Sequence, residues 1–284
     1  MYLFFAKGLK VENLKKPAIQ RDIVPSLSCS FASIPLFDGG KGAELLVGEG
    51  DKILRYDKLA RRREGGYVYS PFSGIVSGFR VIDHPFVGRV TCVDIAVSKK
   101  VEKRKLDKPG KDQHSPEELT EIAKNAGIVD EYDGIPLYRK LQIFARDKVS
   151  MVVADAIDDE PYVSSGMAVF AENRDQVLRG LHLVQEACPG SNAAVTVMAP
   201  FGIRKIRRIP SRIGEIPVSK ITGKYPVWVG LEKMVSPYGK PIGKVGVQAC
   251  AAFAQAVDNA EPQLDCVVTV SGDAVKSKRN IRVA

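Results

Sequence analysis

The chain has 284 residues, with 42 lysine and arginine side chains against 33 aspartate and glutamate side chains, and a formal net charge of +9. Hydrophobic residues make up 45% and charged residues 26%, which is the composition of a globular protein and excludes a disordered one. At about 150 residues per domain, this length predicts roughly two domains. No window approaches the roughly 18 consecutive apolar residues of a membrane helix, and the apolar start is too short for a secretory signal. We therefore expect a cytoplasmic protein.

The cysteines and histidines argue against a metal centre. Five cysteines are widely spaced and form no C-x-x-C pair, so neither a disulfide framework nor a zinc site fits them. Iron-sulfur ligation needs closely spaced thiolates, and we expect no cluster in this chain. The presence of only three histidines argues against a histidine-rich metal site as well. The cysteines are Cys29, Cys92, Cys188, Cys250 and Cys266.

The first part of the chain, to about Ser98, is predicted to be a small all-β module. It consists of short β-type runs separated by glycine and proline. These runs cover residues 43–47, 52–56, 67–69, 74–79 and 91–97. Residues 99–111 follow with seven basic side chains and almost no apolar anchor, which is typical of a linker.

Beyond the linker, the pattern changes to alternating helices and strands. Ser115 as N-cap, Pro116 at the first helical position and Glu118 at the third form a capping box, so a helix begins here. It should end near Asn125, before Gly127. Further strands are predicted at residues 150–154, 193–199, 227–231 and 265–270, and helices at 173–187 and 247–257. This alternation indicates an α/β domain.

Two glycine-rich pieces of the β module, residues 47–54 and 69–76, resemble the barrel-sandwich hybrid domains that include lipoyl and biotinyl carriers. Such carriers expose a modified lysine on a hairpin between the two halves. Here that stretch, residues 61–66, reads Arg-Arg-Arg-Glu-Gly-Gly and has no lysine. The sequence therefore favours a scaffolding module over a swinging arm.

An acidic segment at residues 154–162 comes directly after a predicted strand. Ligands bind beyond the carboxyl ends of strands in open α/β sheets, and carboxylates there can hold ribose hydroxyls or the edge of a flavin ring. The alternative is an acidic surface loop, which is the commoner case. The segment alone leaves both interpretations open.

Several segments in a fixed order resemble the RnfC family, which includes the proline-reductase-associated protein PrdC and is similar to the flavin-binding subunit of respiratory complex I. The order extends over about 230 residues, although no single motif is decisive. The segments are the β module, Gly-Ile-Val at 127–129, the acidic loop at 158–162, residues 237–241 leading into 245–248, and the closing residues 268–273.

The resemblance implies a fold and a domain division. Residues 1–98 would form the barrel-sandwich hybrid β module, residues 99–114 the basic linker, residues 115–222 a Rossmann-like α/β domain of the FMN and NADH type, and residues 223–284 the start of a ubiquitin-like SLBB segment. The family continues into a ferredoxin domain with two clusters, whose cysteines do not follow here. A truncated chain and a naturally short paralogue both agree with this.

The flavin loop departs from the family pattern. After Gly-Ile-Val the family has a glycine-rich loop, whose backbone N–H groups approach the FMN phosphate. This chain instead has Asp130, Glu131 and Asp133, followed by Gly134 and, further on, Lys140. Three carboxylates would face a phosphate, and at an effective dielectric of about 20 each like-charge contact near ~4 Å costs on the order of several kcal/mol. This loop argues against FMN binding.

The second family loop, N-x-x-E-x-E-P, is better retained. Asp155 stands at the asparagine, Asp158 at the first glutamate and Glu160 at the second. The resemblance implies that these positions contact the flavin and the nicotinamide nucleotide. The candidate cofactor-binding residues are therefore Gly127, Gly134, Lys140, Asp155, Asp158 and Glu160; the sequence assigns no catalytic residue.

The function implied by the resemblance is an electron-transfer subunit that passes electrons from NADH, via FMN, to iron-sulfur carriers elsewhere. Its partners would be other subunits of a redox complex and a ferredoxin-like protein or domain, with peripheral association at the cytoplasmic face of a membrane. The alternative is a degenerate, non-catalytic paralogue that docks or assembles such a complex. Nucleic acid is not expected as a partner, because neither the linker nor the basic residues at 204–212 contain aromatic side chains.

Overall fold

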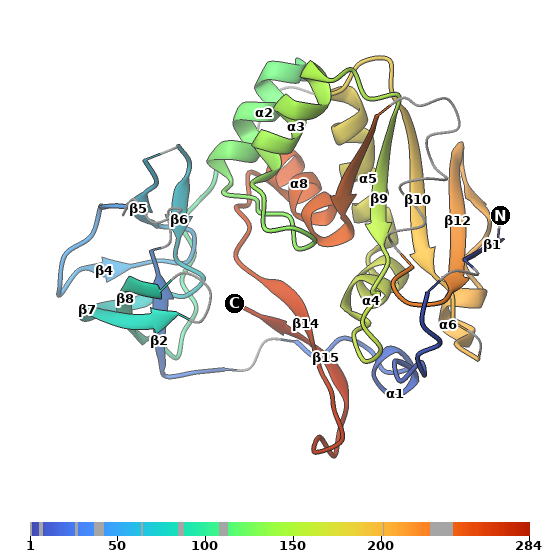
Figure 1. Ribbon diagram of the computed structural model, residues 1–284. Coiled ribbons are helices and arrows are strands. Elements are labelled where there is room, and N and C mark those ends of the chain that lie inside the picture. The colour runs from blue at the N-terminus through green and yellow to red at the C-terminus, as the bar shows by residue number, and fades with distance from the viewer. Residues whose placement is uncertain are drawn as a thin grey trace.

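The computed structural model describes residues 2–5, 8–25, 28–36, 43–63, 65–84, 88–107, 113–200, 202–227 and 241–284. A β module and an α/β unit lie side by side, and a C-terminal hairpin runs between them (Figure 1). Each of the two units has its own cluster of buried hydrophobic side chains. Most of the strand predicted at residues 227–231, and residues 237–240 of the family pattern, lie outside the described residues.

The β module is built from two small antiparallel sheets. One has the strand order β2-β8-β7-β4 and the other β3-β5-β6. The predicted strands of this region are confirmed, with somewhat different bounds, and Leu59, Val76 and Ile95 are fully buried between them. The bounds are β2 (Phe31–Pro35), β3 (Glu44–Leu45), β4 (Lys52–Ile53), β5 (Lys58–Arg61), β6 (Tyr67–Tyr69), β7 (Gly74–His84) and β8 (Gly88–Val97).

The β5–β6 hairpin packs against the α/β unit. The hydroxyl of Tyr69 donates to the carbonyl of Asn125 at 2.8 Å, and a side chain at Gly66 would collide with the carbonyl of Lys124. A swinging arm needs a free hairpin tip, so these contacts support a scaffolding module.

The α/β unit contains a parallel sheet in the order β1-β12-β10-β9-β13, with β11 antiparallel at β12. The strand β9, which pairs with β10 on one side and β13 on the other, is buried along almost its whole length, as its apolar residues predict. The first strand, β1, pairs with β12, which the predicted division at residue 98 does not anticipate. The bounds are β1 (Tyr2–Phe5), β9 (Met151–Ala156), β10 (Asn192–Met198), β11 (Arg212–Ile213), β12 (Ile216–Gly223) and β13 (Ile242–Gly246).

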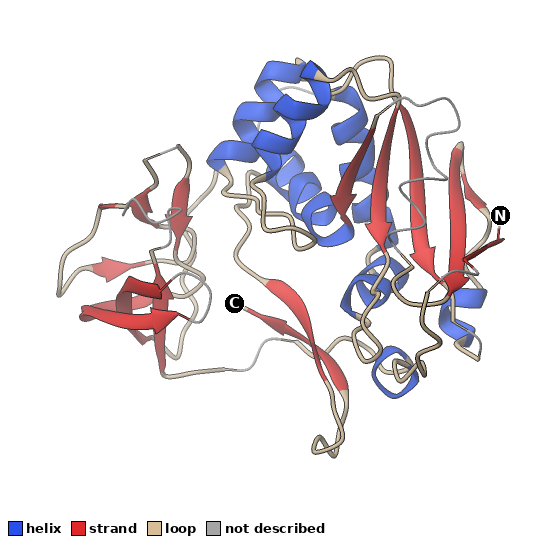
Figure 2. Cartoon of the chain, in the orientation of Figure 1, coloured by secondary structure: helices blue, strands red, loops and turns tan. Residues whose placement is uncertain are grey.

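Helices cover this sheet, and α5 and α8 pack together on one face of it (Figure 2). Their backbones approach closely because Gly180 has no side chain, and a Cβ there would overlap the carbonyl group of Cys250. The helices are α1 (Lys16–Ile19), α2 (Pro116–Asn125), α3 (Leu137–Arg146), α4 (Ser165–Glu172), α5 (Arg174–Glu186), α6 (Arg204–Arg207) and α8 (Val247–Asn259). None of the described helices is both long and apolar enough to cross a membrane.

The capping box at the start of α2 is confirmed. The Ser115 hydroxyl accepts the backbone N–H of Glu118 at 3.2 Å, and the Glu118 carboxylate accepts the backbone N–H of Ser115 at 2.9 Å. The helices predicted at residues 173–187 and 247–257 are confirmed as α5 and α8.

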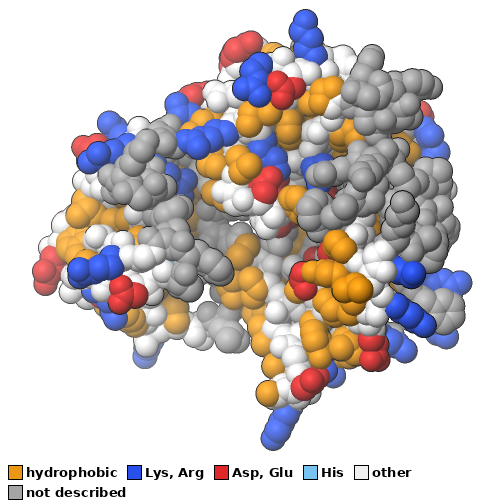
Figure 3. Space-filling model, viewed as in Figure 1, with side chains coloured by type: hydrophobic (Ala, Val, Ile, Leu, Met, Phe, Trp, Pro, Cys, Tyr) orange, Lys and Arg blue, Asp and Glu red, His pale blue; other side chains and the backbone are white. Residues whose placement is uncertain are grey.

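The chain closes with a hairpin of β14 (Cys266–Val270) and β15 (Arg279–Val283). Gln248 at the start of α8 holds it: its amide donates to the carbonyl of Val267 at 3.0 Å and accepts the N–H of Val267 at 2.6 Å. Hydrophobic side chains gather along the hairpin in the space-filling view (Figure 3). Val268, Val270 and Val283 of the hairpin are partly exposed.

Candidate functional site

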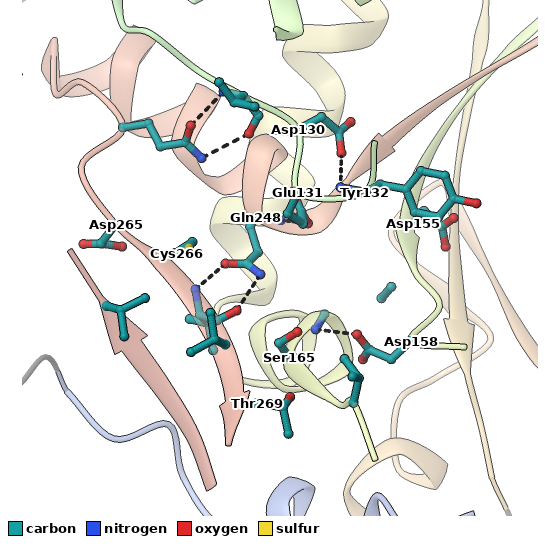
Figure 4. Close-up of a pocket in the computed structure, with 18 of the residues that line it drawn as sticks. Asp130, Glu131, Tyr132, Asp155, Asp158, Ser165, Gln248, Asp265, Cys266 and Thr269 are labelled. Carbon is teal, nitrogen blue, oxygen red and sulfur yellow. Dashed lines mark hydrogen bonds between the residues drawn. The ribbon is translucent and has the colours of Figure 1, made fainter. Parts of the chain in front are cut away.

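A cavity of about 1150 Å³ lies outside the carboxyl ends of β9 and β13, and the C-terminal hairpin forms its opposite wall (Figure 4). In the sheet register, Asp155 at the end of β9 stands beside Gly246 at the end of β13. This is where open α/β sheets bind ligands. The cavity is therefore the candidate functional site.

The cavity is strongly acidic. Arg62 is the one lysine or arginine among its described lining residues. Uncharged polar side chains, among them Gln248, Gln263 and Thr269, complete the lining. The acidic lining residues are Asp130, Glu131, Asp155, Asp158, Asp159, Glu160 and Asp265.

Lys140 organises the acidic loop at residues 130–134. Its ammonium group is buried and donates to Asp130 at 2.7 Å and to Asp133 at 2.8 Å. The same oxygen of Asp130, Oδ2, also accepts the N–H of Gly246 at 3.0 Å. Two of the three carboxylates predicted to face a phosphate thus share an ion pair with one lysine inside the protein.

The third carboxylate, Glu131, lies at the N-terminus of α8. One of its oxygens accepts the N–H of Gln248 at 2.7 Å and the other accepts the N–H of Ala249 at 3.0 Å. This approach requires glycine at position 246, because a Cβ there would overlap the Glu131 carboxyl group. Burial, and then the neighbouring charge of Asp130, raise the pKa of Glu131 to about 8, although the two backbone donors oppose this shift.

Asp158 occupies the N-terminus of α4 in the same way. Its two oxygens accept the N–H groups of Gly166 at 3.0 Å and Met167 at 2.7 Å. Burial raises its pKa, and these hydrogen bonds oppose the shift. Asp158 therefore caps a helix as well as lining the cavity.

Among the carboxylates of the described part of the chain, Asp155 has a buried oxygen that no hydrogen bond uses. Its Oδ1 accepts the N–H of Ile157 at 2.9 Å and the hydroxyl of Thr196 at 3.0 Å. Its Oδ2 is buried and has no hydrogen-bond partner among the described residues. Burial raises the pKa of Asp155 to about 6.

Glu160 is held in place by residues from two distant parts of the chain. Its Oε1 accepts the hydroxyl of Tyr225 at 3.0 Å. Its carbonyl accepts the ammonium group of Lys15, which also donates to the carbonyl of Val163 at 2.9 Å. Lys15 is fully buried, and burial lowers its pKa to about 8, although the charges of Asp158, Asp159 and Glu160 oppose this shift.

Four of the six predicted site residues line the cavity: Gly127, Asp155, Asp158 and Glu160. Gly134 does not line it; its φ of +71° serves a turn within the acidic loop. Lys140 does not line it either, because it lies beneath the loop and binds Asp130 and Asp133. Among the described residues, no cluster of three or more His, Cys, Asp or Glu side chains could hold a metal ion.

The sequence prediction did not include Lys15, nor the wall of the cavity formed by Gln248 and the residues of β14. Lys15 meets Glu160, and Gln248 meets Glu131, only in the folded chain. The one local signal was Gln248, a polar residue at the second position of α8, close after the end of β13.

The chain is similar in sequence to C subunits of ion- and proton-translocating oxidoreductase complexes. The C subunit of the ion-translocating oxidoreductase complex of Vibrio cholerae serotype O1 is 26% identical over 264 residues, which cover 85% of this chain and 34% of that protein. The C subunit of the proton-translocating ferredoxin:NAD(+) oxidoreductase complex of Clostridium ljungdahlii is 26% identical over 269 residues, with 84% and 56% covered. The chain thus spans from a third to just over half of these relatives. No family model matches the chain.

Among solved structures, a chain of the NAD+-reducing NiFe hydrogenase in its H2-reduced state is similar over 60% of this chain and 37% of that chain. The identity is 16% and the TM-score is 0.46.

Proposed function

We propose that the chain is an RnfC-like protein, as its similarity to C subunits of ion- and proton-translocating oxidoreductase complexes suggests. It would form the nucleotide-binding part of an RnfC/PrdC-like electron-transfer subunit. The observation that carries this proposal is the cavity beyond β9 and β13, which is lined by three residues of the retained family loop, Asp155, Asp158 and Glu160. The barrel-sandwich hybrid, Rossmann-like and SLBB assignments are part of the same proposal.

The cavity has features that suit the hydroxyl-rich part of NADH or of a flavin. Carboxylates at the carboxyl end of a strand accept hydrogen bonds from ribose hydroxyls. Asp155 offers one unused, buried oxygen for such a bond, and Glu160 is kept in position by Tyr225. The binding and orientation of a nucleotide are the tasks that these residues would perform.

The phosphate of FMN does not fit this cavity. Phosphates bind to free backbone N–H groups at helix N-termini, and at the two helices that begin here Glu131 and Asp158 already accept those groups. The same holds for the diphosphate of NADH, so the proposal places only the hydroxyl-bearing part of NADH beside Asp155 and Glu160, and derives no electron-transfer step through FMN.

The proposed partners are the other subunits of a redox complex, among them a ferredoxin-like iron-sulfur protein or domain. The surface around α6 supports an acidic partner, because Arg204, Arg207 and Arg208 are exposed there. An acidic partner would associate faster at low salt. Through such a complex, the chain would lie at the cytoplasmic face of a membrane.

A titration of the purified chain with NADH, followed by the fluorescence of the reduced nicotinamide, tests the proposal. We expect saturable binding in the micromolar range, weakened at least tenfold by Glu160→Ala. Glu215→Ala is the matched control, since this carboxylate is fully exposed and outside the cavity. Equal binding by wild type and Glu160→Ala would remove the cavity from the proposal.

The docking or assembly function remains as the second candidate because both helix N-termini at the cavity are occupied by carboxylates. The names of the homologues describe oxidoreductase complexes and do not favour it. It would replace the first proposal if neither NADH nor any flavin bound to the folded chain.

A further inference from the structure

The cavity contains two sets of backbone donors that are typical of phosphate sites, and the chain itself uses both. At α8, the N–H groups of Gln248 and Ala249 each bind one oxygen of Glu131. At α4, the N–H groups of Gly166 and Met167 each bind one oxygen of Asp158. A carboxylate in this position makes the hydrogen bonds that two phosphate oxygens would otherwise make.

Glu131 is fixed in this position by its neighbours. The adjacent Asp130 is buried and bound both to Lys140 and to the N–H of Gly246. The turn closes through the N–H of Gly134, which donates to the carbonyl of Asp130 at 2.9 Å. Because Gly246 lacks a side chain, the Glu131 carboxyl group packs directly on the backbone at the end of β13. A phosphate could reach α8 only if this assembly opened.

A second, independent observation concerns the rest of the cavity. Asp155 is 5% exposed, lines the cavity, and has a buried Oδ2 without a partner among the described residues. A buried acceptor of this kind calls for a hydrogen-bond donor from a ligand. Hydroxyl and N–H groups supply such a donor, whereas a phosphate dianion does not.

We propose that the cavity binds a flavin without its phosphate, riboflavin, in preference to FMN, and that the Glu131 carboxyl group takes the place of the missing phosphate at α8. This rests on the proposed function of the cavity as a nucleotide site. The uncharged ribityl hydroxyls and the ring N–H are the donors available to Asp155, and the chain's own carboxylate satisfies the helix in place of the ligand. The acidic loop then acts as a specificity element.

The first experiment compares riboflavin and FMN on the wild-type chain by quenching of flavin fluorescence. We expect riboflavin to bind at least tenfold more tightly than FMN. FMN binding that equals or exceeds riboflavin binding would overturn the inference, because the occupied helix N-termini would then not discriminate. This comparison needs no variant and so does not depend on the folding of one.

The second experiment removes the substituting carboxylate. Glu131→Ala frees the N–H groups of Gln248 and Ala249, so FMN affinity should rise at least tenfold while riboflavin affinity stays within about threefold. Asp133→Ala is the matched control: it removes a carboxylate of the same loop that binds Lys140 and not α8. It should leave the ratio of the two affinities unchanged. An equal rise in FMN affinity in both variants would contradict the inference, because the charge of the loop, and not the binding of Glu131 to the N-terminus of α8, would then determine the preference between the two flavins.

The outcomes separate this inference from the proposed function. If NADH binds and riboflavin does not, the inference fails and the nucleotide site stands. If FMN binds more tightly than riboflavin, the inference fails and a flavin site stands. If neither NADH nor either flavin binds, both fail together.

Discussion

Lys140 is the residue on which the loop at residues 130–134 depends, because its ammonium group forms ion pairs with both Asp130 and Asp133. Asp130 has no exposed surface. Removing one partner of a buried ion pair costs about 3–5 kcal/mol, so Lys140→Met should lower the free energy of unfolding by about this amount in urea denaturation. Arg146→Met breaks an exposed pair with Asp147 and should leave the midpoint nearly unchanged. Equal effects of the two substitutions would contradict this role for Lys140.

Glu131 makes stability depend on pH. Its carboxyl titrates near 4.5 when unfolded, and burial and then Asp130 raise the pKa to about 8 in the folded chain. Between these values the folded state binds more protons, so stability is highest below pH 4.5 for this group and falls as pH rises towards 8. Asp155, raised to about 6, adds to the lower part of this window.

Urea denaturation at several pH values from about 5 to about 8.5 measures this dependence, and Glu131→Gln should flatten it. Glu215→Gln, at an exposed position, is the control and should retain the slope of the wild type. A wild-type stability that increased steadily across this pH range would contradict the buried state of Glu131.

At the scale of elements, the packing of α5 against α8 fixes the position of α8. This matters for the site because Glu131 of the loop at residues 130–134 binds the start of α8. Alanine in place of a helical glycine usually stabilises by up to about 1 kcal/mol. Gly180→Ala should instead destabilise by about 1–3 kcal/mol, because its Cβ would overlap the Cys250 carbonyl and separate the helices. Thermal unfolding measures whether the substitution stabilises or destabilises the protein. Gln176→Ala, at an exposed position on the same helix, is the control. A gain in stability for Gly180→Ala would show that the two helices can move apart freely.

At the scale of the whole molecule, two separate hydrophobic clusters predict two units of unfolding. Leu59 is fully buried in the β module and Phe253 in the α/β unit. Truncation of a buried side chain of this size to alanine costs about 2–5 kcal/mol. In scanning calorimetry, Leu59→Ala and Phe253→Ala should each shift a different transition, and a single transition shifted equally by both would mean that the two units unfold as one.

Local signals predicted the elements that depend on nearby residues. The capping box at Ser115 and the apolar run of β9 each involve positions within a few residues of one another, and both are confirmed. Asp155, Asp158 and Glu160 were predicted from the resemblance to a family loop, whose residues are close together in the sequence; Asp155 lies within β9, and Asp158 and Glu160 follow that strand. Lys15 gave no such signal, since its partner Glu160 lies 145 residues away in the chain.

By itself, the sequence determined the alternation of β-type runs and helices, the acidic segment after a strand and the resemblance to a family, because these depend on composition and short spacing. Only the tertiary structure decided which way each carboxylate is turned. Glu131 and the N–H of Gln248 are 117 residues apart, and they meet because β13 pairs with β9 and places α8 beside the acidic loop. The long-range pairing of β13 with β9 therefore brings the Glu131 carboxyl group to the N-terminus of α8, the position in which a bound phosphate would otherwise lie.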